Sequence, residues 1–211
     1  MKYYTICLVE LPKQLTIVIG GGSVAARKVE GLITAGAQVK IISPALTPEL
    51  QRRAEAGEVT VLPRSYQDGD LEGAHLVIAA TNDATVNEAV WQEAQRRGCL
   101  VNVVDDPQHS NFILPAVVQR GEMSISISTG GNSPALARRM RERIEKLIGP
   151  EYGVLAELMG ELRPELIASF PEGKERLEAA LRVVDSDIIE IIQVHGRDAA
   201  LTYGREQLHR K

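Results

Sequence analysis

The stretch IVIGGGSVAARK, residues 17–28, constrains the fold of this chain more than any other feature. An apolar segment that resembles a strand runs into three glycines and then into a helical pattern. Gly20, Gly22 and Ala25 satisfy the fingerprint G-x-G-x-x-(G/A), which combines a tight turn, close backbone approach to a pyrophosphate and close helix–strand packing. The helix N-terminus adds free N–H groups and a partial positive charge. The stretch predicts a dinucleotide site, although a glycine-rich turn also serves packing alone.

The sequence around this stretch alternates short apolar runs with helical patterns from residue 15 to about 104. Strands are predicted over 15–20, 38–43, 59–63, 75–81 and 99–105. Helices are predicted over 23–36, 48–57 and 84–98, each ending at a glycine that suits a C-terminal cap. Most of the strands are continuously apolar, as expected when both faces of a parallel sheet are covered. The alternation predicts an α/β fold with a Rossmann-type doubly wound parallel sheet.

The pattern changes after Pro115. Residues 116–129 predict a hairpin around an Arg120-Gly121 turn, and the next helix has Ser133 as N-cap and Pro134 at its first position. From about residue 150 only helices are predicted, with interruptions near Pro164, Pro171 and Gly196. The sequence therefore predicts three parts: a dinucleotide-binding Rossmann domain over 1–113, a hairpin-and-helix region over 114–148 that could extend the sheet or serve as a dimerisation region, and a small helical C-terminal domain over 149–211.

Composition excludes several classes of protein. The 211 residues are 44% hydrophobic and 25% charged, with a net charge of −4, so binding of nucleic acid is not expected. No apolar run reaches the roughly 18 residues that span a membrane, and the start of the chain does not read as a signal peptide. A cytoplasmic protein is expected. Cys7 and Cys99 are predicted to be buried thiols, and the four histidines lack the spacing of metal ligands.

The end of the second predicted strand lacks a feature that such sheets often carry. An acid there would hydrogen-bond the ribose hydroxyl and repel a 2′-phosphate, but the sequence has Ser43. The residues alone therefore leave both NAD and NADP open.

Three further stretches bear on function: AATNDATVN at 79–87, NVVDDPQHSNFILPA at 102–116 and SISTGGNSPALARRMRERIE at 126–145. Together with the glycine stretch, they resemble the precorrin-2 dehydrogenases of siroheme biosynthesis over about residues 5–150. The resemblance implies NAD-dependent oxidation of precorrin-2 to sirohydrochlorin by a stand-alone homodimeric enzyme with its active site near the subunit boundary. Some members also insert Fe²⁺, which leaves ferrochelatase activity open.

The resemblance also implies individual roles. Asp105 would be the general acid/base, partly desolvated at a strand end so that its pKa suits proton transfer; the alternative is a turn residue before Pro107. Asp106 is expected to be a solvated turn residue. Thr81 and Asn82 would contact the cofactor, cap the next helix, or both. The full set of implied cofactor contacts is Gly20, Gly22, Ser23, Val24, Ser43, Pro44, Ala45, Thr81, Asn82, Asn102 and Val103.

The substrate implied by the resemblance carries eight carboxylates. Arg138 and Arg139 lead a helix that is rich in arginine, and its start at Ser133 favours anions, so these three residues are predicted to bind substrate. The alternative for the arginines is an ordinary solvated face. A serine that is phosphorylated in some siroheme synthases aligns with Thr129, beside Ser128, so the chain departs from that pattern. His109 would be either a proton shuttle or a plain loop residue.

A different class of protein also fits the glycine stretch, namely a non-catalytic nucleotide-sensing Rossmann module. Such modules typically keep the acid at the end of the second strand, where this chain has Ser43. They have no need of the stretch DDPQHSNFILP after the fifth strand. The sequence therefore favours the enzyme.

Overall fold

The structure is a computed structural model that describes residues 4–210. Met1–Tyr3, at the start of the predicted first domain, and Lys211, at the end of the last, lie outside the described residues. The chain divides into two compact units, 1–114 and 115–211.

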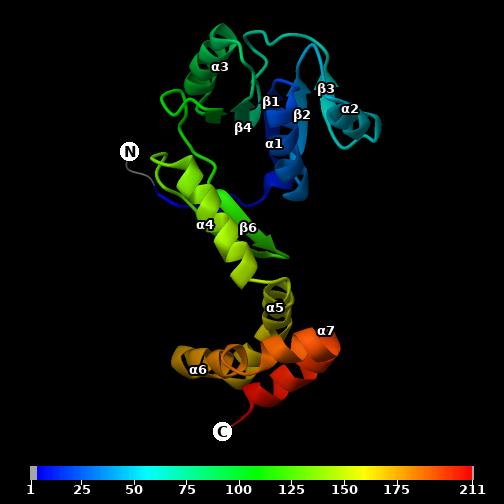
Figure 1. The fold of residues 1–211 in the computed structure, drawn as a ribbon, viewed down its shortest axis with the longest axis vertical. Helices are drawn as coiled ribbons and strands as arrows, with labels where there is room; N and C mark the ends of the chain where they lie inside the picture. The colour runs from blue at the N-terminus through cyan, green and yellow to red at the C-terminus, as the bar shows by residue number, and fades with distance from the viewer. Residues whose placement is uncertain (1–3, 211) are drawn as a thin grey trace. The chain divides into compact units, whose positions relative to one another are not determined.

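The first unit is built on a five-stranded parallel sheet with the strand order β3-β2-β1-β4-β5 (Figure 1). The central strand β1 pairs in parallel with both β2 and β4. This confirms the doubly wound sheet. The strands are β1 (Leu15–Ile19), β2 (Gln38–Ile42), β3 (Thr60–Leu62), β4 (Ala74–Ala79) and β5 (Leu100–Val103).

Successive residues of a strand point to opposite faces of the sheet, and here both sets are apolar. Helices therefore pack on both faces. One core cluster joins Val18 and Ile41 to helix α1 (Ser23–Thr34) and helix α2 (Pro48–Glu55). The other joins Ile17 and Val77 to helix α3 (Ala84–Arg97). All these elements lie within two residues of the predicted bounds. Gly36, Gly57 and Gly98, which follow the three helices, have positive φ, as a C-terminal cap requires.

One carboxylate of the first unit is buried. Glu93, on α3, is 1% exposed and accepts hydrogen bonds from the Tyr66 hydroxyl, the Leu71 amide (3.2 Å) and Arg97 Nε (2.6 Å). Burial alone would raise the pKa of Glu93, but the donors outweigh it and lower the pKa. Burial and the neighbouring carboxylate raise the pKa of Tyr66. This network fastens residues 66–71 to α3, and the sequence did not predict it.

The second unit begins with the antiparallel hairpin of β6 (Ala116–Arg120) and β7 (Met123–Ile127). Arg120 pairs with Met123, so the turn residues are Gly121 and Glu122 rather than the predicted Arg120 and Gly121. The turn lies there because a two-residue hairpin loop that starts with a positive φ favours glycine at its first position, and Gly121 has φ +55°.

Arg120 links this hairpin to the next helix, α4 (Pro134–Leu147). Its guanidinium donates to the carbonyls of Ile148 (2.8 Å) and Glu145 (3.0 Å), which have no partners within the helix. At the other end of α4, Ser133 is the N-cap as predicted, because its hydroxyl accepts from the Leu136 amide (3.2 Å).

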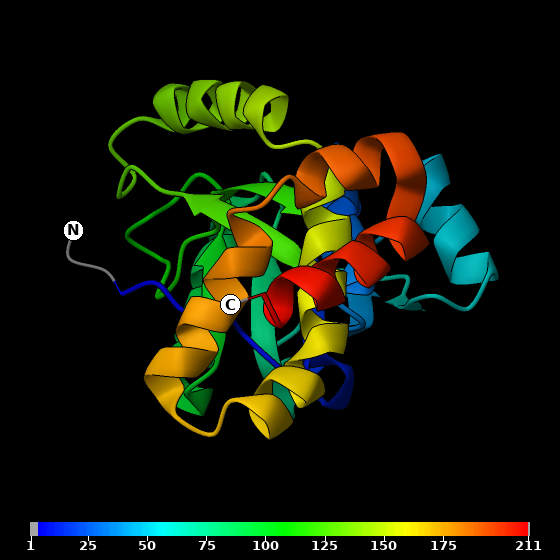
Figure 2. The same ribbon diagram turned by 90° about the horizontal axis from the view of Figure 1, so that it is seen from below.

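Three helices complete this unit: α5 (Glu151–Ser169), α6 (Gly173–Val184) and α7 (Ile188–Leu208) (Figure 2). They share one apolar core that includes Leu158, Leu162 and Leu166. The predicted break at Pro164 is wrong, because Pro164 lies inside α5. A proline inside a helix costs about 3 kcal/mol, and we attribute its tolerance to the buried leucine face on either side of it. The chain does leave the helix at Pro171, and Gly196 bends α7 with φ +80°. The break at 185–187 was not predicted.

Candidate active site at the carboxyl ends of β1 and β4

The strand order places a switch point between β1 and β4. From β1 the chain winds outward to β2 and β3, and it then crosses to β4 and β5 on the other side. Open α/β sheets bind ligands outside the carboxyl ends of their strands at such a point. The loops there are the glycine loop after β1, residues 20–22, and residues 80–83 after β4.

Steric fit explains the first two glycines of the loop. Gly20 has φ +111°, and a Cβ there would lie 2.4 Å from the Ala80 carbonyl oxygen. A Cβ on Gly21 would lie 2.1 Å from the Ala45 carbonyl oxygen. Neither position accepts a side chain, so the loops after β1, β2 and β4 pack against one another through backbone. The fingerprint does not include Gly21, and its role was missed; the uninterrupted run of three glycines was the available signal.

Gly22 differs from both, since a Cβ there would meet nothing within 4 Å. It is the N-cap of α1, and no side chain caps this helix. The first hydrogen bond of the helix runs from the Ala26 amide to the Gly22 carbonyl (3.0 Å), so the amides of Ser23, Val24 and Ala25 have no partner within the helix. Open space over three free amides and a positive helix end fits the pyrophosphate of a dinucleotide.

Ser43 is turned into the protein. Its side chain is buried, and its hydroxyl donates to the Ala45 carbonyl (2.7 Å). Pro44 and Ala45 are exposed. Contact of these three residues with the adenosine stays a prediction, and the Ser43 hydroxyl is already engaged within the chain.

The loop after β4 leads directly into α3. Thr81 Oγ1 accepts from the Asp83 amide (3.2 Å), and Asn82 is exposed. The N-cap is Asp83, whose carboxylate accepts from the amides of Thr85 (2.9 Å) and Val86 (3.2 Å). The predicted cap at Thr81 or Asn82 is therefore one or two residues too early, because a carboxylate one position later reaches the free amides directly. The contacts of Thr81 and Asn82 with a cofactor stay a prediction.

Asn102 and Val103 belong to the end of β5 rather than following it. Asn102 Nδ2 donates to the Phe112 carbonyl (3.0 Å), and the Val103 amide donates to Ser110 Oγ (3.0 Å). These contacts hold the returning segment 104–112 along the outer edge of the sheet. Their predicted role toward a cofactor is not tested by these contacts.

Asp105 leaves the end of β5 with φ +61°, in the left-handed region. Its side chain is exposed in this unit, so the expected partial desolvation is not found. The sequence did not predict the electrostatic attraction between Asp105 and Lys28, on α1. Burial lowers the pKa of Lys28, and nearby Arg27 adds to this, whereas attraction to Asp105 opposes it. The pair of basic residues after the glycine loop was the available signal.

Asp106 lies in the turn as expected, and its side chain is 38% exposed, but the sequence did not predict its contacts. Its carboxylate accepts from His109 Nδ1 (2.6 Å) and from the Gln108 amide (3.1 Å). The other ring nitrogen of His109 lies 2.9 Å from a carboxylate oxygen of Glu88, on α3. The hydrogen bond with His109 lowers the pKa of Asp106 and outweighs the opposing effect of burial.

The residues predicted to bind substrate lie in the second unit. Arg138 and Arg139 are exposed, and both donate to Glu142, at 3.0 and 3.1 Å. Their charge is thus partly balanced within α4. Before this helix, Thr129 Oγ1 donates to the Ser133 carbonyl and accepts from the Ser133 amide, both at 3.1 Å.

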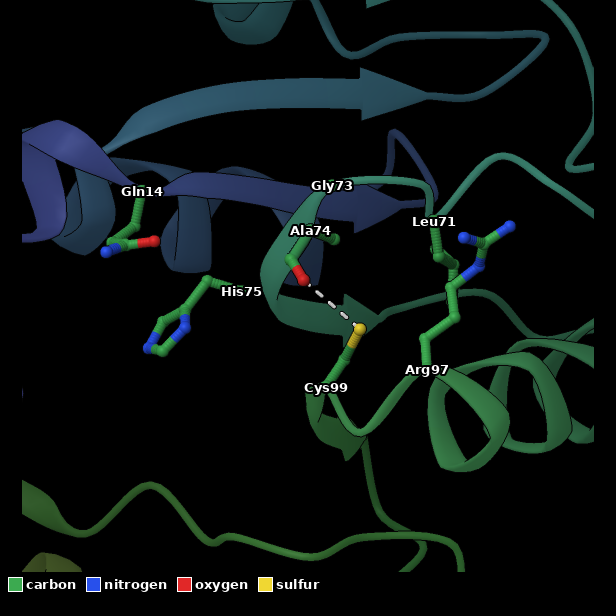
Figure 3. Close-up of a pocket in the computed structure, with 7 residues that line it drawn as sticks. All are labelled: Gln14, Leu71, Gly73, Ala74, His75, Arg97 and Cys99. Atoms are coloured by element: carbon green, nitrogen blue, oxygen red, sulfur yellow. Dashed lines mark hydrogen bonds between the residues drawn. The ribbon is translucent and has the colours of Figure 1, made fainter.

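A hollow of about 390 Å³ lies elsewhere in the first unit. Figure 3 shows Gln14, His75 and Cys99 around it, at or before the amino ends of β1, β4 and β5. Because parallel strands have all their carboxyl ends at one edge, this hollow lies at the opposite edge from the glycine loop. Cys99 is buried as predicted, whereas Cys7 is exposed because its segment packs into no strand or helix.

Two kinds of feature are absent from residues 4–210. No group of three or more His, Cys, Asp or Glu side chains there is placed to hold a metal ion. Within the same range, none of the helices combines the length and apolarity needed to cross a membrane.

Comparison with known proteins places these observations in a family. Residues 7–116 match the family described as "Putative NAD(P)-binding", and residues 120–147 match the one described as "Sirohaem biosynthesis protein central". The siroheme synthase of Chromobacterium violaceum is 40% identical over 95% of this chain and 42% of its own length. That of Methylobacillus flagellatus is 45% identical over 76% of this chain and 34% of its own length. This chain thus spans less than half the length of these curated relatives.

A solved structure agrees with the sequence relatives. SirC, a precorrin-2 dehydrogenase, matches 97% of this chain and 100% of its own, with a TM-score of 0.77 and 25% identity. The glycine loop, the uncapped N-terminus of α1 and all five strands of the parallel sheet lie within the residues that the first family covers. The chain therefore belongs to the NAD(P)-binding family that matches residues 7–116, and it carries the sirohaem biosynthesis central segment directly after it.

Proposed function

We propose that this chain is an NAD-dependent dehydrogenase that oxidises precorrin-2 to sirohydrochlorin. The observation that carries the proposal is the uncapped N-terminus of α1 under an open Gly22, at the same edge of the sheet as the exposed carboxylate of Asp105. The likeness to SirC supports the choice of substrate, and the match to an NAD(P)-binding family supports the cofactor.

The reaction removes two hydrogens from the macrocycle, so that precorrin-2 and NAD⁺ give sirohydrochlorin, NADH and a proton. The nicotinamide, when bound, supplies the acceptor for the hydride. The free amides of Ser23 and Val24 hold the pyrophosphate. A carboxylate oxygen of Asp105 takes the proton that the macrocycle releases, and the ammonium of Lys28 attracts that carboxylate.

A substrate with many carboxylates needs positively charged side chains outside the dinucleotide site. We assign this role to Arg138 and Arg139, with the helix start at Ser133. Each guanidinium has five N–H donors, and the shared contact with Glu142 leaves most of them free for the carboxylates of the substrate.

The proposal includes a homodimer formed through residues 114–148. Among the described residues, β6 and β7 pair only with each other, so each strand leaves an edge that a second chain could reach. On α4, Leu136 is 52% and Leu147 is 75% exposed. Apolar side chains in that position are suited to contact with a second copy of the chain.

The first experiment is an anaerobic assay of the purified chain with precorrin-2 and NAD⁺, with NADP⁺, or with neither. The proposal expects the sirohydrochlorin spectrum with NAD⁺ and none without cofactor. Equal rates with NADP⁺ would correct the choice of cofactor. Subsequent addition of Fe²⁺ tests iron insertion against a control without protein. Folded chain that binds NAD⁺ but leaves the spectrum unchanged would instead favour the nucleotide-sensing module.

A further inference from the structure

One side chain fastens the loop that carries Asp105 to α3. His109 Nδ1 lies 2.6 Å from Asp106 Oδ2, and His109 Nε2 lies 2.9 Å from Glu88 Oε2. Asp106 belongs to the loop, whereas Glu88 belongs to the second turn of α3. Trp91, further along that helix, presents its ring to the imidazole edge to face, with 5.9 Å between ring centroids. The imidazole therefore bridges two carboxylates that are 18 residues apart in sequence, Glu88 and Asp106.

The two distances require a particular protonation state. An ionised carboxylate only accepts hydrogen bonds, and a neutral imidazole has a single N–H donor. With a neutral ring, one nitrogen lone pair would face a carboxylate oxygen at less than 3 Å. Only the imidazolium donates to both Asp106 and Glu88. The hydrogen bond to Asp106 raises the pKa of His109, and the charges of Asp106 and Glu88 add to this against the effect of burial.

Asp106 is in turn held by its own loop. Its Oδ1 accepts from the amides of Gln108 (3.1 Å) and His109 (3.3 Å), and its carbonyl accepts from the Ser110 hydroxyl (2.8 Å). Its amide donates to the Val103 carbonyl (3.1 Å). Asp105 lies inside this closed turn, so whatever fixes Asp106 also fixes the left-handed backbone from which the Asp105 carboxylate projects.

We propose that His109, as an imidazolium shared by Asp106 and Glu88, is a positioning residue that holds Asp105 at the carboxyl edge of the sheet. When His109 loses its proton, one of the two bonds is lost and the loop loosens from α3. The existence of this clamp does not depend on the proposed function, but its effect on turnover rests on that function.

The sign of the pH dependence follows from the two partners. The clamp is present below the ordinary pKa of histidine, about 6.5, and is lost as the pH rises through the raised pKa of His109. On the acid side it is present above the ordinary pKa of aspartate, about 3.9, and is lost as the pH falls through the lowered pKa of Asp106. Among the described residues, the charged groups that face the ring are Asp106 from the loop and Glu88 from α3.

The clamp is tested first without substrate, by NMR of the full chain. Ring-nitrogen signals are assigned to His109 by their absence in His109→Gln. We expect both nitrogens to carry a proton below the midpoint, a midpoint above 6.5, and Asp105 and Ser110 amide signals that titrate with it. Glu88→Gln, which keeps the shape of the side chain, should lower the midpoint. His75→Gln, which removes an exposed imidazole from the other edge of the sheet, should leave it unchanged.

Turnover gives the second readout. His109→Gln and Glu88→Gln should lower kcat about tenfold, as expected for a misplaced acid/base, while KM for NAD⁺ changes less than about twofold. Glu88→Gln should also move the alkaline fall of kcat to lower pH, which a merely structural role would not do. A His109 midpoint at or below 6.5, or Asp105 amides indifferent to it, would overturn the clamp. If the wild-type chain fails to oxidise precorrin-2, only the proposed function is refuted. The NMR measurement still tests whether the clamp exists.

Discussion

Asn111 and Val101 exchange two hydrogen bonds across the outer edge of β5. The Val101 amide donates to Asn111 Oδ1 (2.8 Å), and the Asn111 amide donates to the Val101 carbonyl (3.0 Å). The side-chain amide of Asn111 also donates to the Cys99 carbonyl (2.9 Å). An edge strand would otherwise present unpaired backbone groups to other chains. The returning segment therefore closes the sheet at β5 and, a few residues earlier, carries Asp105.

Replacement of Asn111 by alanine should destabilise the first unit. The change leaves the Val101 amide and the Cys99 carbonyl without their side-chain partner, which we expect to lower the free energy of unfolding by about 1–3 kcal/mol. Urea unfolding followed by circular dichroism measures the loss. Gln51→Ala, on the exposed face of α2, removes a side-chain amide without such contacts and should stay within about 0.5 kcal/mol of wild type.

Alanine at two glycines of the same loop should affect different properties: Gly20→Ala the stability of the fold, and Gly22→Ala the affinity for NAD⁺. Gly20→Ala places a Cβ 2.4 Å from the Ala80 carbonyl oxygen at φ +111°, so we expect a large loss of stability. Gly22→Ala meets nothing within 4 Å and should cost less than about 1 kcal/mol. Its methyl group would stand in the space assigned to the pyrophosphate, so NAD⁺ affinity should fall at least about tenfold. Thermal unfolding and calorimetric titration separate the two effects; undiminished NAD⁺ affinity in Gly22→Ala would place the cofactor elsewhere.

The buried carboxylate of Glu93 should contribute to the fall in the free energy of unfolding at low pH. Because its pKa is lowered in the folded chain, its contribution is present above the ordinary glutamate pKa of about 4.3 and is lost as the pH falls through the lowered value. Glu93→Gln should cost about 1–3 kcal/mol at neutral pH and flatten the fall below pH 4.3. Chemical unfolding at a series of pH values tests both. Glu55→Gln, exposed on α2, is the matched control and should keep the wild-type profile.

Asp105→Asn should retain the fold and NAD⁺ affinity while lowering turnover by about two to four orders of magnitude, the usual worth of a general acid/base. The amide keeps the size of the side chain but takes up no proton. Single-turnover absorbance measurements under anaerobic conditions give the rate. Asp187→Asn, an exposed change in the second unit, controls for the loss of one charge. Wild-type turnover in Asp105→Asn would remove this carboxylate from the mechanism.

The proposed dimer can be separated from general surface effects. Leu136→Lys and Leu147→Lys place a charge on the exposed apolar side chains of α4 within the predicted dimerisation region, and should raise the dimer dissociation constant at least about tenfold. Leu177→Lys changes a comparable side chain on α6, 59% exposed and outside that region, and should have no effect. Sedimentation equilibrium measures all three. A monomeric wild-type chain would refute the dimer at once.

The elements of the first unit were predictable because local pattern and packing agree. Strands such as Leu15–Ile19 are apolar on both faces, and the helices between them end at glycines with positive φ, so neither signal depends on distant contacts. Pro164 shows where this fails: local chemistry predicts a break, but the buried leucine face of α5 outweighs it. The turn at Gly121 and the helix cap at Asp83 were each predicted one or two residues too early. Neighbouring residues could form either contact, and the sequence does not show which of them does.

The candidate site was predictable in outline and not in its contacts. The glycine fingerprint located the free helix end, since it depends on backbone geometry alone. The contacts of Glu88 with His109 and of Tyr66 with Glu93 were not predicted, because each joins residues more than 20 positions apart that only the tertiary fold brings together. The same holds for the electrostatic attraction between Lys28 and Asp105. One consequence is that Asp106 and His109, ordinary loop residues in sequence, connect the loop to Glu88 of α3 in the structure.

The orientation of Ser43 has a consequence for coenzyme engineering. Its hydroxyl is committed to the Ala45 carbonyl, and its oxygen lies 2.9 Å from where a Cβ on Gly21 would stand. A carboxylate installed at position 43 to impose selectivity would thus face a carbonyl oxygen in a crowded interior rather than a ribose. Selectivity between the two nicotinamide coenzymes would have to be rewritten at the exposed neighbours Pro44 and Ala45, where a new side chain can reach outward without disturbing the turn beneath it.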